Sequence, residues 1–534
     1  MKRWWLVVSA PLLVFLALGA SVGAAEEKGP KNDAAIEDAA SKAGPAGKSP
    51  ALTEPAVFKL DEVPAFGKEE GAAGSPGRYL GGQYVQCSTQ PSKQVKRYPK
   101  LNSKKPLYGS VVLDGSFVDP SVGTVFRFVL DQSGDAPLAE SGEPEAVKSS
   151  SLLAALARAL TGEKAESPQP KPPEPVRYDR LCFDLNGDLD LTNDPVLQPA
   201  KEPALPRSPY EGAVFEDLMV PVDFGPGLGT RPVRLIPRLR VFGPDRAYVE
   251  FVPTVACKGK IRIGKDQYTV CLSQTQMISG RFDRPLVDLE ITPIGGPAPS
   301  RRSFSSIWLC AMREFDGRLY TFSATPLGDE LTVKPYEGEY GILRVGPGGR
   351  AITKLGVLGE LVSKDALVSV GKMTMPPPEE LPREHRLPVG DYAPVRLALD
   401  YGRLKMSVQA LTLASSQPAE EGEARPPAVY AIQIRKDKPF VFELSGKPAV
   451  VFTGPRKSRT FKPGEEVKIE AVLAEPSLGV MIAGLFDGSR KRGEIKIHDG
   501  GKEIALPDYE RLDPTVVIRS SGGTQVAEGK MPFG

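Results

Sequence analysis

The chain has 534 residues, of which 41% are hydrophobic and 25% charged, with 54 glycines and 53 prolines. One hydrophobic core cannot serve that length, so about three domains of roughly 100–200 residues are expected, and the glycine and proline content favours turn-rich β structure over helix bundles. Removal of the predicted signal takes away two of the 68 basic residues, so the mature chain would have 66 basic and 66 acidic residues and no net charge. This balance predicts no basic run on one face, and it sets nucleic acid and an anionic membrane surface aside as partners.

Residues 1–25 have the layout of a secretory signal. Lys2 and Arg3 supply positive charge, Trp4 to Ala20 form an apolar run, and the small residues 23–25 end it. We therefore expect a secreted, periplasmic or cell-envelope protein with no membrane span after signal cleavage. An uncleaved anchor stays open as the alternative, because Trp4 and Trp5 lengthen the apolar run.

Residues 26–78 are mainly small, polar and charged, and we predict a disordered linker there. A first β domain is expected over 79–297. Its residues 133–175 are of low complexity and predict an inserted surface loop, within which leucines at helical spacing in 150–160 predict one short amphipathic helix. Packing of that helix on its own domain is favoured over a partner-binding role.

Strand-like runs then follow one another along the chain. The alternating residues 260–264 and 267–272 predict a hairpin that turns at Lys265-Asp266. A second β domain is expected over 298–428. In 429–534, short strands separated by turns resemble an immunoglobulin-like β-sandwich. The predicted fold class is therefore mainly β, with several antiparallel β-sandwich-like domains joined by low-complexity linkers.

The strongest local signal is the acidic loop, residues 184–194, with the sequence Asp-Leu-Asn-Gly-Asp-Leu-Asp-Leu-Thr-Asn-Asp. Calcium takes about six to eight oxygen ligands at about 2.4 Å, and acidic or amide side chains at alternate positions of a tight loop supply them. The candidate metal ligands, with the fourth serving through its backbone carbonyl, are Asp184, Asn186, Asp188, Asp190 and Asp194.

This loop resembles the calcium loop of EF-hand and dockerin-type repeats, and the resemblance implies Ca²⁺ as the bound cation. Two positions depart from the pattern: Leu189 stands where glycine eases the sharp turn, and Pro195 stands where a bidentate carboxylate belongs. An acidic β-turn that merely links two strands is therefore the alternative interpretation, and both stay open.

The acidic loop together with Gly280-Arg-Phe-Asp283 also resembles a group of uncharacterised exported bacterial multidomain β proteins. The resemblance covers roughly residues 79–297, and it implies no known activity. Ser273 to Ser279 lacks the acidic residues that would make a second cation loop, so no second site is expected.

The residues that catalysis commonly uses are scarce. His385 and His498 are the only histidines, lie in different predicted domains, and are expected at the surface. Four of the five cysteines lie in strand-like apolar runs and predict small buried side chains, although one disulfide is allowed.

We therefore expect a binding or structural protein with a protein or polysaccharide partner of the envelope. A secreted hydrolase that uses paired carboxylates is the alternative, because sequence spacing does not reveal such a pair.

Overall fold

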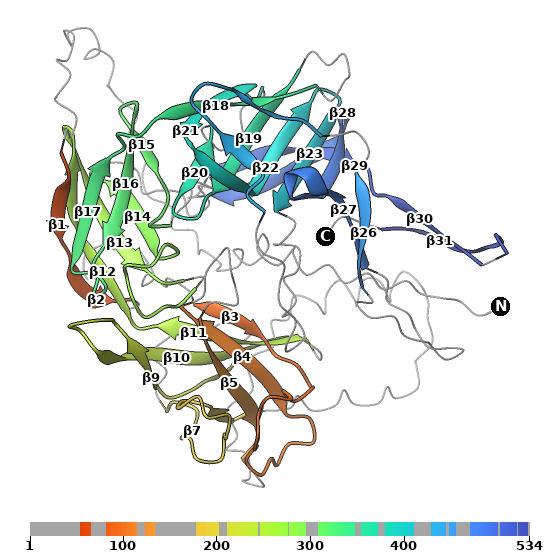
Figure 1. Cartoon of the computed structure of the whole chain (residues 1–534). Helices are drawn as coiled ribbons and strands as arrows, with labels where there is room; N and C mark the ends of the chain where they lie inside the picture. The colour runs from red at the N-terminus through yellow and green to blue at the C-terminus, as the bar shows by residue number, and fades with distance from the viewer. Residues whose placement is uncertain are drawn as a thin grey trace, which may run out of the picture. The chain divides into compact units, whose positions relative to one another are not determined.

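The computed structural model describes most of the chain from residue 54 onward. The described ranges are 54–65, 82–114, 123–133, 178–201, 211–243, 246–275, 277–294, 308–347, 354–371, 380–410, 429–444, 448–454, 470–499, 502–520 and 522–531. Nearly all regular elements in these ranges are β-strands, in several antiparallel sheets (Figure 1), which confirms the predicted fold class. The signal, the inserted loop and its helix lie outside the described residues.

The chain divides into two compact units. Unit 1 comprises residues 1–65, 114–123 and 255–534, and unit 2 comprises residues 66–113 and 124–254. The boundary between the units falls near residue 254, and the three β domains predicted over 79–297, 298–428 and 429–534 stay predictions.

The described strands of unit 2 form two sheets. The order of strands is β3-β11-β10-β8, with β9 also paired to β10, in one sheet and β4-β5-β6-β7 in the other. The strands are β3 (Gln83–Gln86), β4 (Leu107–Leu113), β5 (Thr124–Asp131), β6 (Arg180–Phe183), β7 (Val196–Leu197), β8 (Glu211–Val214), β9 (Leu218–Asp223), β10 (Thr230–Gly243) and β11 (Arg246–Pro253). Buried phenylalanines join the two sheets: Phe128 and Phe183 both make edge contacts with Phe251, at ring-centroid distances of 5.6 and 5.8 Å. The core of unit 2 therefore lies between its two sheets.

The first part of unit 1 pairs two four-stranded sheets, β1-β17-β16-β15 and β14-β13-β12-β2. The strands are β1 (Ala56–Lys59), β2 (Asp61–Pro64), β12 (Val255–Ile263), β13 (Asp266–Ser273), β14 (Asp288–Pro293), β15 (Arg313–Phe315), β16 (Arg318–Ala324) and β17 (Glu330–Pro335). One buried cluster, which includes Leu60, Leu272 and Val333, takes side chains from both sheets. Stacked sheets of this kind bury the apolar face of each.

Residues 54–65 correct the predicted linker over 26–78. These residues form β1 and β2, which pair with β17 and β12, and Leu60 between them is buried. Each strand has only four residues, so its burial depends on partners about 200 or more residues away along the chain, and composition alone does not reveal such partners.

The predicted hairpin is confirmed, with its turn moved by one residue. β12 and β13 pair from Cys257 opposite Leu272 to Ile263 opposite Asp266, so the turn is Gly264-Lys265. Gly264 has φ of +61°, a conformation that glycine adopts without steric cost.

The remainder of unit 1 is built on a nine-stranded sheet. Its path is β20-β19-β22-β23-β28-β27-β26, with β24 paired to β22 and β29 to β28, and a three-stranded sheet has the order β21-β18-β25. The strands are β18 (Tyr340–Val345), β19 (Gly356–Val362), β20 (Leu367–Val370), β21 (Glu384–Pro388), β22 (Gly390–Tyr401), β23 (Leu404–Ala410), β24 (Ile432–Ile434), β25 (Phe440–Phe442), β26 (Ala449–Gly454), β27 (Glu470–Glu475), β28 (Val480–Asp499) and β29 (Lys502–Arg511). The 3₁₀ turn η2 (Pro476–Leu478) precedes β28.

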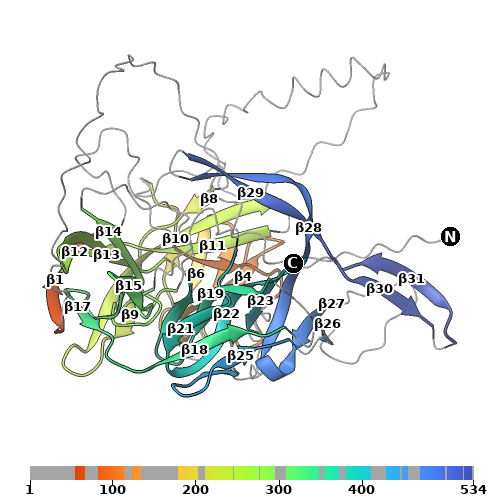
Figure 2. The same cartoon turned by 90° about the horizontal axis from the view of Figure 1, so that it is seen from above.

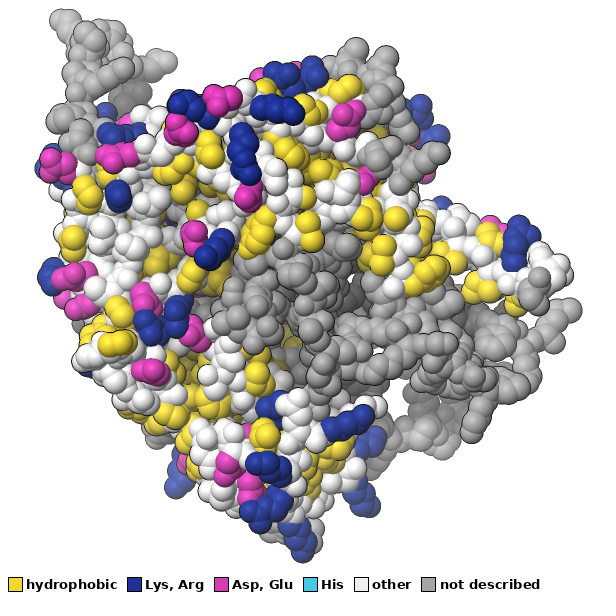
Figure 3. Space-filling view, viewed as in Figure 1, with side chains coloured by type: hydrophobic (Ala, Val, Ile, Leu, Met, Phe, Trp, Pro, Cys, Tyr) yellow, Lys and Arg dark blue, Asp and Glu magenta, His cyan; other side chains and the backbone are white. Residues whose placement is uncertain are grey.

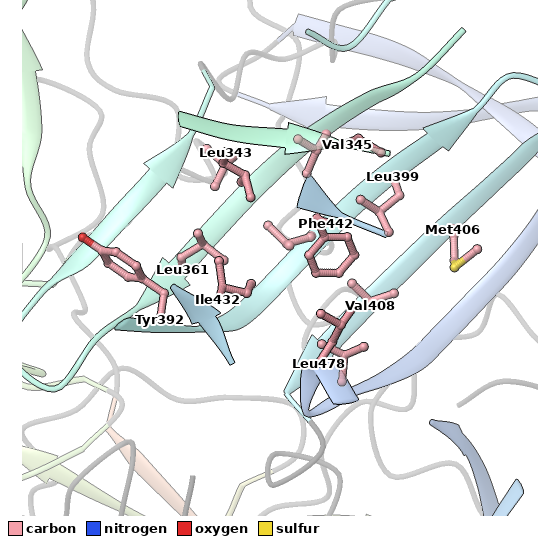
Figure 4. Close-up of a cluster of buried hydrophobic side chains, with 14 of the residues drawn as sticks. Leu343, Val345, Leu361, Tyr392, Leu399, Met406, Val408, Ile432, Phe442 and Leu478 are labelled. Atoms are coloured by element: carbon pink, nitrogen blue, oxygen red, sulfur yellow. The ribbon is translucent and has the colours of Figure 1, made fainter. Parts of the chain in front are cut away.

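A second buried cluster holds this part together (Figure 4). Leu343 of β18 and Phe442 of β25 pack on Leu361 of β19 and Val408 of β23. The long β28 pairs with β23, so the C-terminal strands share a sheet with residues 356–410. β28 and β29 continue as a long ribbon, and β30 (Thr515–Arg519) with β31 (Gln525–Lys530) forms a separate two-stranded hairpin (Figure 2).

Gly359 of β19 gives a test of this packing. It has φ of +148°, and a Cβ atom there would lie 2.1 Å from the carbonyl oxygen of Arg396 in the neighbouring strand. We expect Gly359→Ala to lower the free energy of unfolding by about 3 kcal/mol, because the two backbones must separate. Gly493→Ala is the matched control, since a Cβ there meets no atom within 4 Å and should change stability by less than about 0.5 kcal/mol. Urea unfolding of both variants makes the comparison, and equal losses would contradict it.

Asp288 is a buried carboxyl at the start of β14, with 4% of its surface exposed. Its Oδ2 accepts hydrogen bonds from the backbone N–H and the hydroxyl of Thr275, both at 2.6 Å, while its buried Oδ1 has no hydrogen-bond partner. Burial raises the pKa of Asp288 to about 6, against the opposing effect of the Thr275 hydrogen bonds. The fold therefore favours the protonated acid.

The sign of the resulting pH dependence follows from that pKa. Because the pKa in the folded state lies above the unfolded value of 3.8, the stabilisation is complete below about pH 4 and is lost as the pH rises through about 6. Between pH 4.5 and 7.5, the parent should lose on the order of 2 kcal/mol relative to Asp288→Asn, which does not titrate. Urea unfolding at both pH values measures the difference. Parallel pH profiles for the two proteins would rule the assignment out, and Asp437→Asn, an exposed site, is the control.

Candidate metal centre

The acidic loop connects β6 to β7 in unit 2. Asp184 directly follows the buried Phe183, and its backbone N–H donates to the carbonyl of Arg127 in β5 at 2.8 Å. This hydrogen bond holds the residue at the end of the sheet, where its side chain is fully buried. The first predicted ligand is therefore fixed by the sheet itself.

The loop folds through a series of side-chain to backbone hydrogen bonds. Asn186 Oδ1 accepts from the N–H of Asp188 at 2.9 Å, and Asp188 Oδ1 accepts from the N–H of Asp190 at 2.8 Å. Gly187 and Leu189 have φ of +72° and +68°. Leu189 thus adopts the left-handed conformation that glycine would give at this position, at the steric cost that a side chain incurs there.

Three carboxylates meet inside the loop. Asp184, Asp188 and Asp194 each place one oxygen within 4.8 Å of the others, and we call these residues the aspartate cluster. Asp194 Oδ1 accepts from the N–H of Leu185 at 3.0 Å. The Oδ2 atoms of Asp184 and Asp194 are buried and have no hydrogen-bond partner. A buried carboxylate oxygen without a donor is costly, which makes these two atoms the feature of the loop that needs an explanation.

The pKa values of the cluster reflect this crowding. Burial raises the pKa of Asp194, and the negative charges of Asp184 and Asp188 raise it further. Asp188 is exposed, and hydrogen bonds, first of all from the side chain of Asn193, lower its pKa. A negative charge is therefore less favourable on Asp194 than on Asp188.

The other two predicted ligands lie differently. The carboxylate of Asp190 forms an ion pair with Arg97 and accepts from the Thr192 hydroxyl at 2.5 Å. Its backbone carbonyl, which is the atom predicted to bind the cation, accepts from the N–H of Asn193 at 3.5 Å. The Thr192 hydroxyl is the main reason that the pKa of Asp190 is lowered. The amide nitrogen of Asn186 donates to Asp188 Oδ2 at 3.2 Å, which keeps Asn186 at the exposed edge of the cluster.

A distant segment clamps the loop, and sequence reasoning did not identify it. The backbone N–H of Lys96 donates to the carbonyl of Leu189 at 2.8 Å, and the N–H of Leu191 donates to the carbonyl of Arg97 at 3.0 Å. The ammonium of Lys96 also donates to the carbonyl of Asp188 at 2.9 Å. Val95 and Tyr98 pack against a buried group that includes Leu191. The one sequence feature that could have pointed to this contact is the density of basic residues in the segment, because it lies against an acidic loop.

The described surroundings of His385 contain no second metal or catalytic site. His385 lies on β21 and is buried, so its expected surface position is wrong. Its Nε2 faces the carbonyls of Val357 at 2.8 Å and Pro382 at 3.2 Å and therefore donates a hydrogen, while burial lowers the pKa of the ring. His498 lies in the backbone pairing of β28 with β29.

The cysteines are not joined by disulfides. Cys182, Cys257 and Cys271 are buried in strands as predicted, whereas Cys310 lies in a turn and is only partly buried. Burial raises the pKa of Cys257 and Cys310 to about 12, so neither thiol is a ready nucleophile at neutral pH.

In the part of the chain that the structure describes, no helix has the length and hydropathy that a membrane span requires. Comparison with known proteins adds no relative: no family model matches the chain, and neither a curated protein nor a solved structure does. The structure therefore shows a mainly β, multi-sheet protein with an aspartate cluster that could hold a metal ion.

Proposed function

We propose that this chain is an exported binding or structural protein in which the acidic loop binds one Ca²⁺ ion. The observation that carries the cation site is the pair of buried oxygens, Asp184 Oδ2 and Asp194 Oδ2, that have no donor although they lie in a cluster of three carboxylates. A cation between them satisfies both oxygens and removes their mutual repulsion.

The charge of the site favours a divalent ion. The aspartate cluster carries three negative charges when ionised, the adjacent Lys96 contributes one positive charge, and Asp190 and Arg97 cancel each other. The net charge of these groups is two negative charges, which equals the charge of one divalent cation with the sign reversed.

The ligand atoms favour a hard cation. All three clustered side chains offer oxygen, and the cluster contains neither histidine nor cysteine, which softer transition metals prefer. Calcium tolerates irregular coordination better than magnesium, and the carboxylates, the Asn186 amide oxygen and water can together complete about six to eight ligands.

The proposed role of the cation is structural. It would tie Asp184, at the end of β6, to Asp194, just before β7, and so close the loop on which residues 95–98 pack. Because the hydrogen bond from the Asp184 N–H to the Arg127 carbonyl holds the start of the loop at the end of a sheet, a stabilising function suits the ion better than a sensing one. The proposed export of the protein is supported by the signal-like residues 1–25.

Calcium should stabilise the parent protein. With a dissociation constant near about 10⁻⁴ M, as extracellular modules show, 10 mM calcium raises the free energy of unfolding by about 2.7 kcal/mol over a chelator solution. Isothermal titration calorimetry and thermal unfolding with calcium or with a chelator measure this. A parent that gives neither heat nor a shift of the unfolding temperature would refute the site.

Asp194→Asn separates a ligand role from a merely structural one. The new amide keeps an oxygen for the N–H of Leu185 and can donate to Asp184 Oδ2, so we expect the calcium-free variant to be as stable as the parent or more stable. Its affinity for calcium should be at least tenfold lower than that of the parent. Asp217→Asn, which removes an exposed carboxylate of the same unit, should respond to calcium like the parent. Retention of the full response in Asp194→Asn would contradict the proposal.

A further inference from the structure

A strongly basic segment lies beside the acidic loop. We call residues 93–105 the basic strip. Six of its thirteen residues are cationic, and the chain has no Asp or Glu between Glu70 and Asp114. All six cationic side chains are exposed: Lys93, Lys96, Arg97, Lys100, Lys104 and Lys105. The expectation that the chain has no basic run was therefore wrong, because the neutral total averages over a local excess.

The backbone of the basic strip is held in place. The fully buried Asp131 accepts hydrogen bonds from the N–H groups of Asn102, at 3.0 and 3.1 Å, and Ser103, at 2.7 Å. The hydroxyl of Tyr178 donates to the carbonyl of Lys105 at 2.8 Å. The cationic side chains thus project from a fixed segment, which lowers the entropic cost of binding a ligand with them.

Half of the cations are not used within unit 2. Lys96 and Arg97 contact the acidic loop, but Lys100, Lys104 and Lys105 have no carboxylate partner among the described residues. Lys and Arg side chains also gather on the surface over β4, β5 and β7 in the space-filling view (Figure 3). This surface offers positive charge that the described residues do not neutralise.

We propose that the basic strip binds an anionic polysaccharide. Five of its six cations are lysines, which bind as point charges and suit repeated carboxylate or sulfate groups that have no fixed bidentate geometry. Two exposed amides lie between them. Gln94 Oε1 accepts from Arg127 and the amide nitrogen of Asn102 donates to the carbonyl of Gln132, so the amide nitrogen of Gln94 and the amide oxygen of Asn102 are the atoms offered to sugar hydroxyls.

The other polyanions fit the surface less well. Nucleic-acid binding normally adds aromatic side chains on which bases stack, but Tyr98 is half-buried and its ring packs edge-on against Tyr108 at 5.2 Å. Peripheral binding to a bilayer normally adds exposed apolar side chains, and no large hydrophobic residue of the strip is exposed.

This inference rests on the binding role proposed above, and its test does not involve the cation site. The mature chain, residues 26–534, is titrated in a chelator with dextran sulfate and with neutral dextran at 50, 100 and 200 mM salt. We expect binding to dextran sulfate alone, weakening steeply as salt rises, as counterion release requires. The variant Lys100→Glu/Lys104→Glu/Lys105→Glu should bind at least tenfold more weakly at 100 mM salt with an unchanged unfolding temperature.

The matched control carries the same change of charge elsewhere. Lys260→Glu/Lys265→Glu/Lys334→Glu alters three exposed lysines of unit 1 and should bind within twofold of the parent. Equal losses in both triple variants, or no binding by the parent, would overturn the proposal. So would tighter binding, at equal salt and equal anion concentration, to a single-stranded oligothymidylate or to phosphatidylglycerol vesicles, since either result assigns the strip to another partner.

Discussion

The fold depends on covering one apolar face of every sheet. In a strand, neighbouring side chains point to opposite faces, so a sheet with one apolar face is stable only when another layer lies on it. Unit 1 meets this constraint twice, once where Leu272 and Val333 meet between two four-stranded sheets and once where Phe442 packs on the long sheet. Unit 2 meets it through the phenylalanines around Phe251. The loops that connect the strands lie at the ends of the sheets, and the candidate metal centre is the loop between β6 and β7.

The same packing explains why the carboxylates of the aspartate cluster are costly to bury. Phe183 and Asp184 are consecutive, so the sheet that buries the ring also brings the carboxylate out of water. Loss of water costs a carboxylate far more than a ring, and the backbone of the loop supplies only some of the hydrogen bonds that would offset it. Asp184 Oδ2 and Asp194 Oδ2 are the two oxygens that receive no hydrogen bond, and a cation is the simplest group that satisfies both.

Local patterns predicted what local contacts determine. Alternation over residues 260–272 was enough for the hairpin, and alternate oxygen-bearing side chains were enough to bring Asp184 and Asp188 together. Asp194 lies one position before the expected carboxylate and still reaches the cluster. Features that depend on distant partners were missed: β1 and β2, the burial of His385, and the contact of Arg97 with Asp190, which lie 93 residues apart.

The charges of unit 2 show why a neutral total is a poor guide to partners. Lys96 and Arg97 belong to the basic strip and also hold the acidic loop, so the two regions of opposite charge stabilise each other where they touch. Away from that contact, each keeps an excess: the aspartate cluster on its buried side and Lys100, Lys104 and Lys105 on the surface. None of these three lysines forms an ion pair with the described residues, and no described cation contacts the buried oxygens of Asp184 and Asp194. Each excess is therefore available to a ligand of its own, a small cation in the first case and an extended anion in the second.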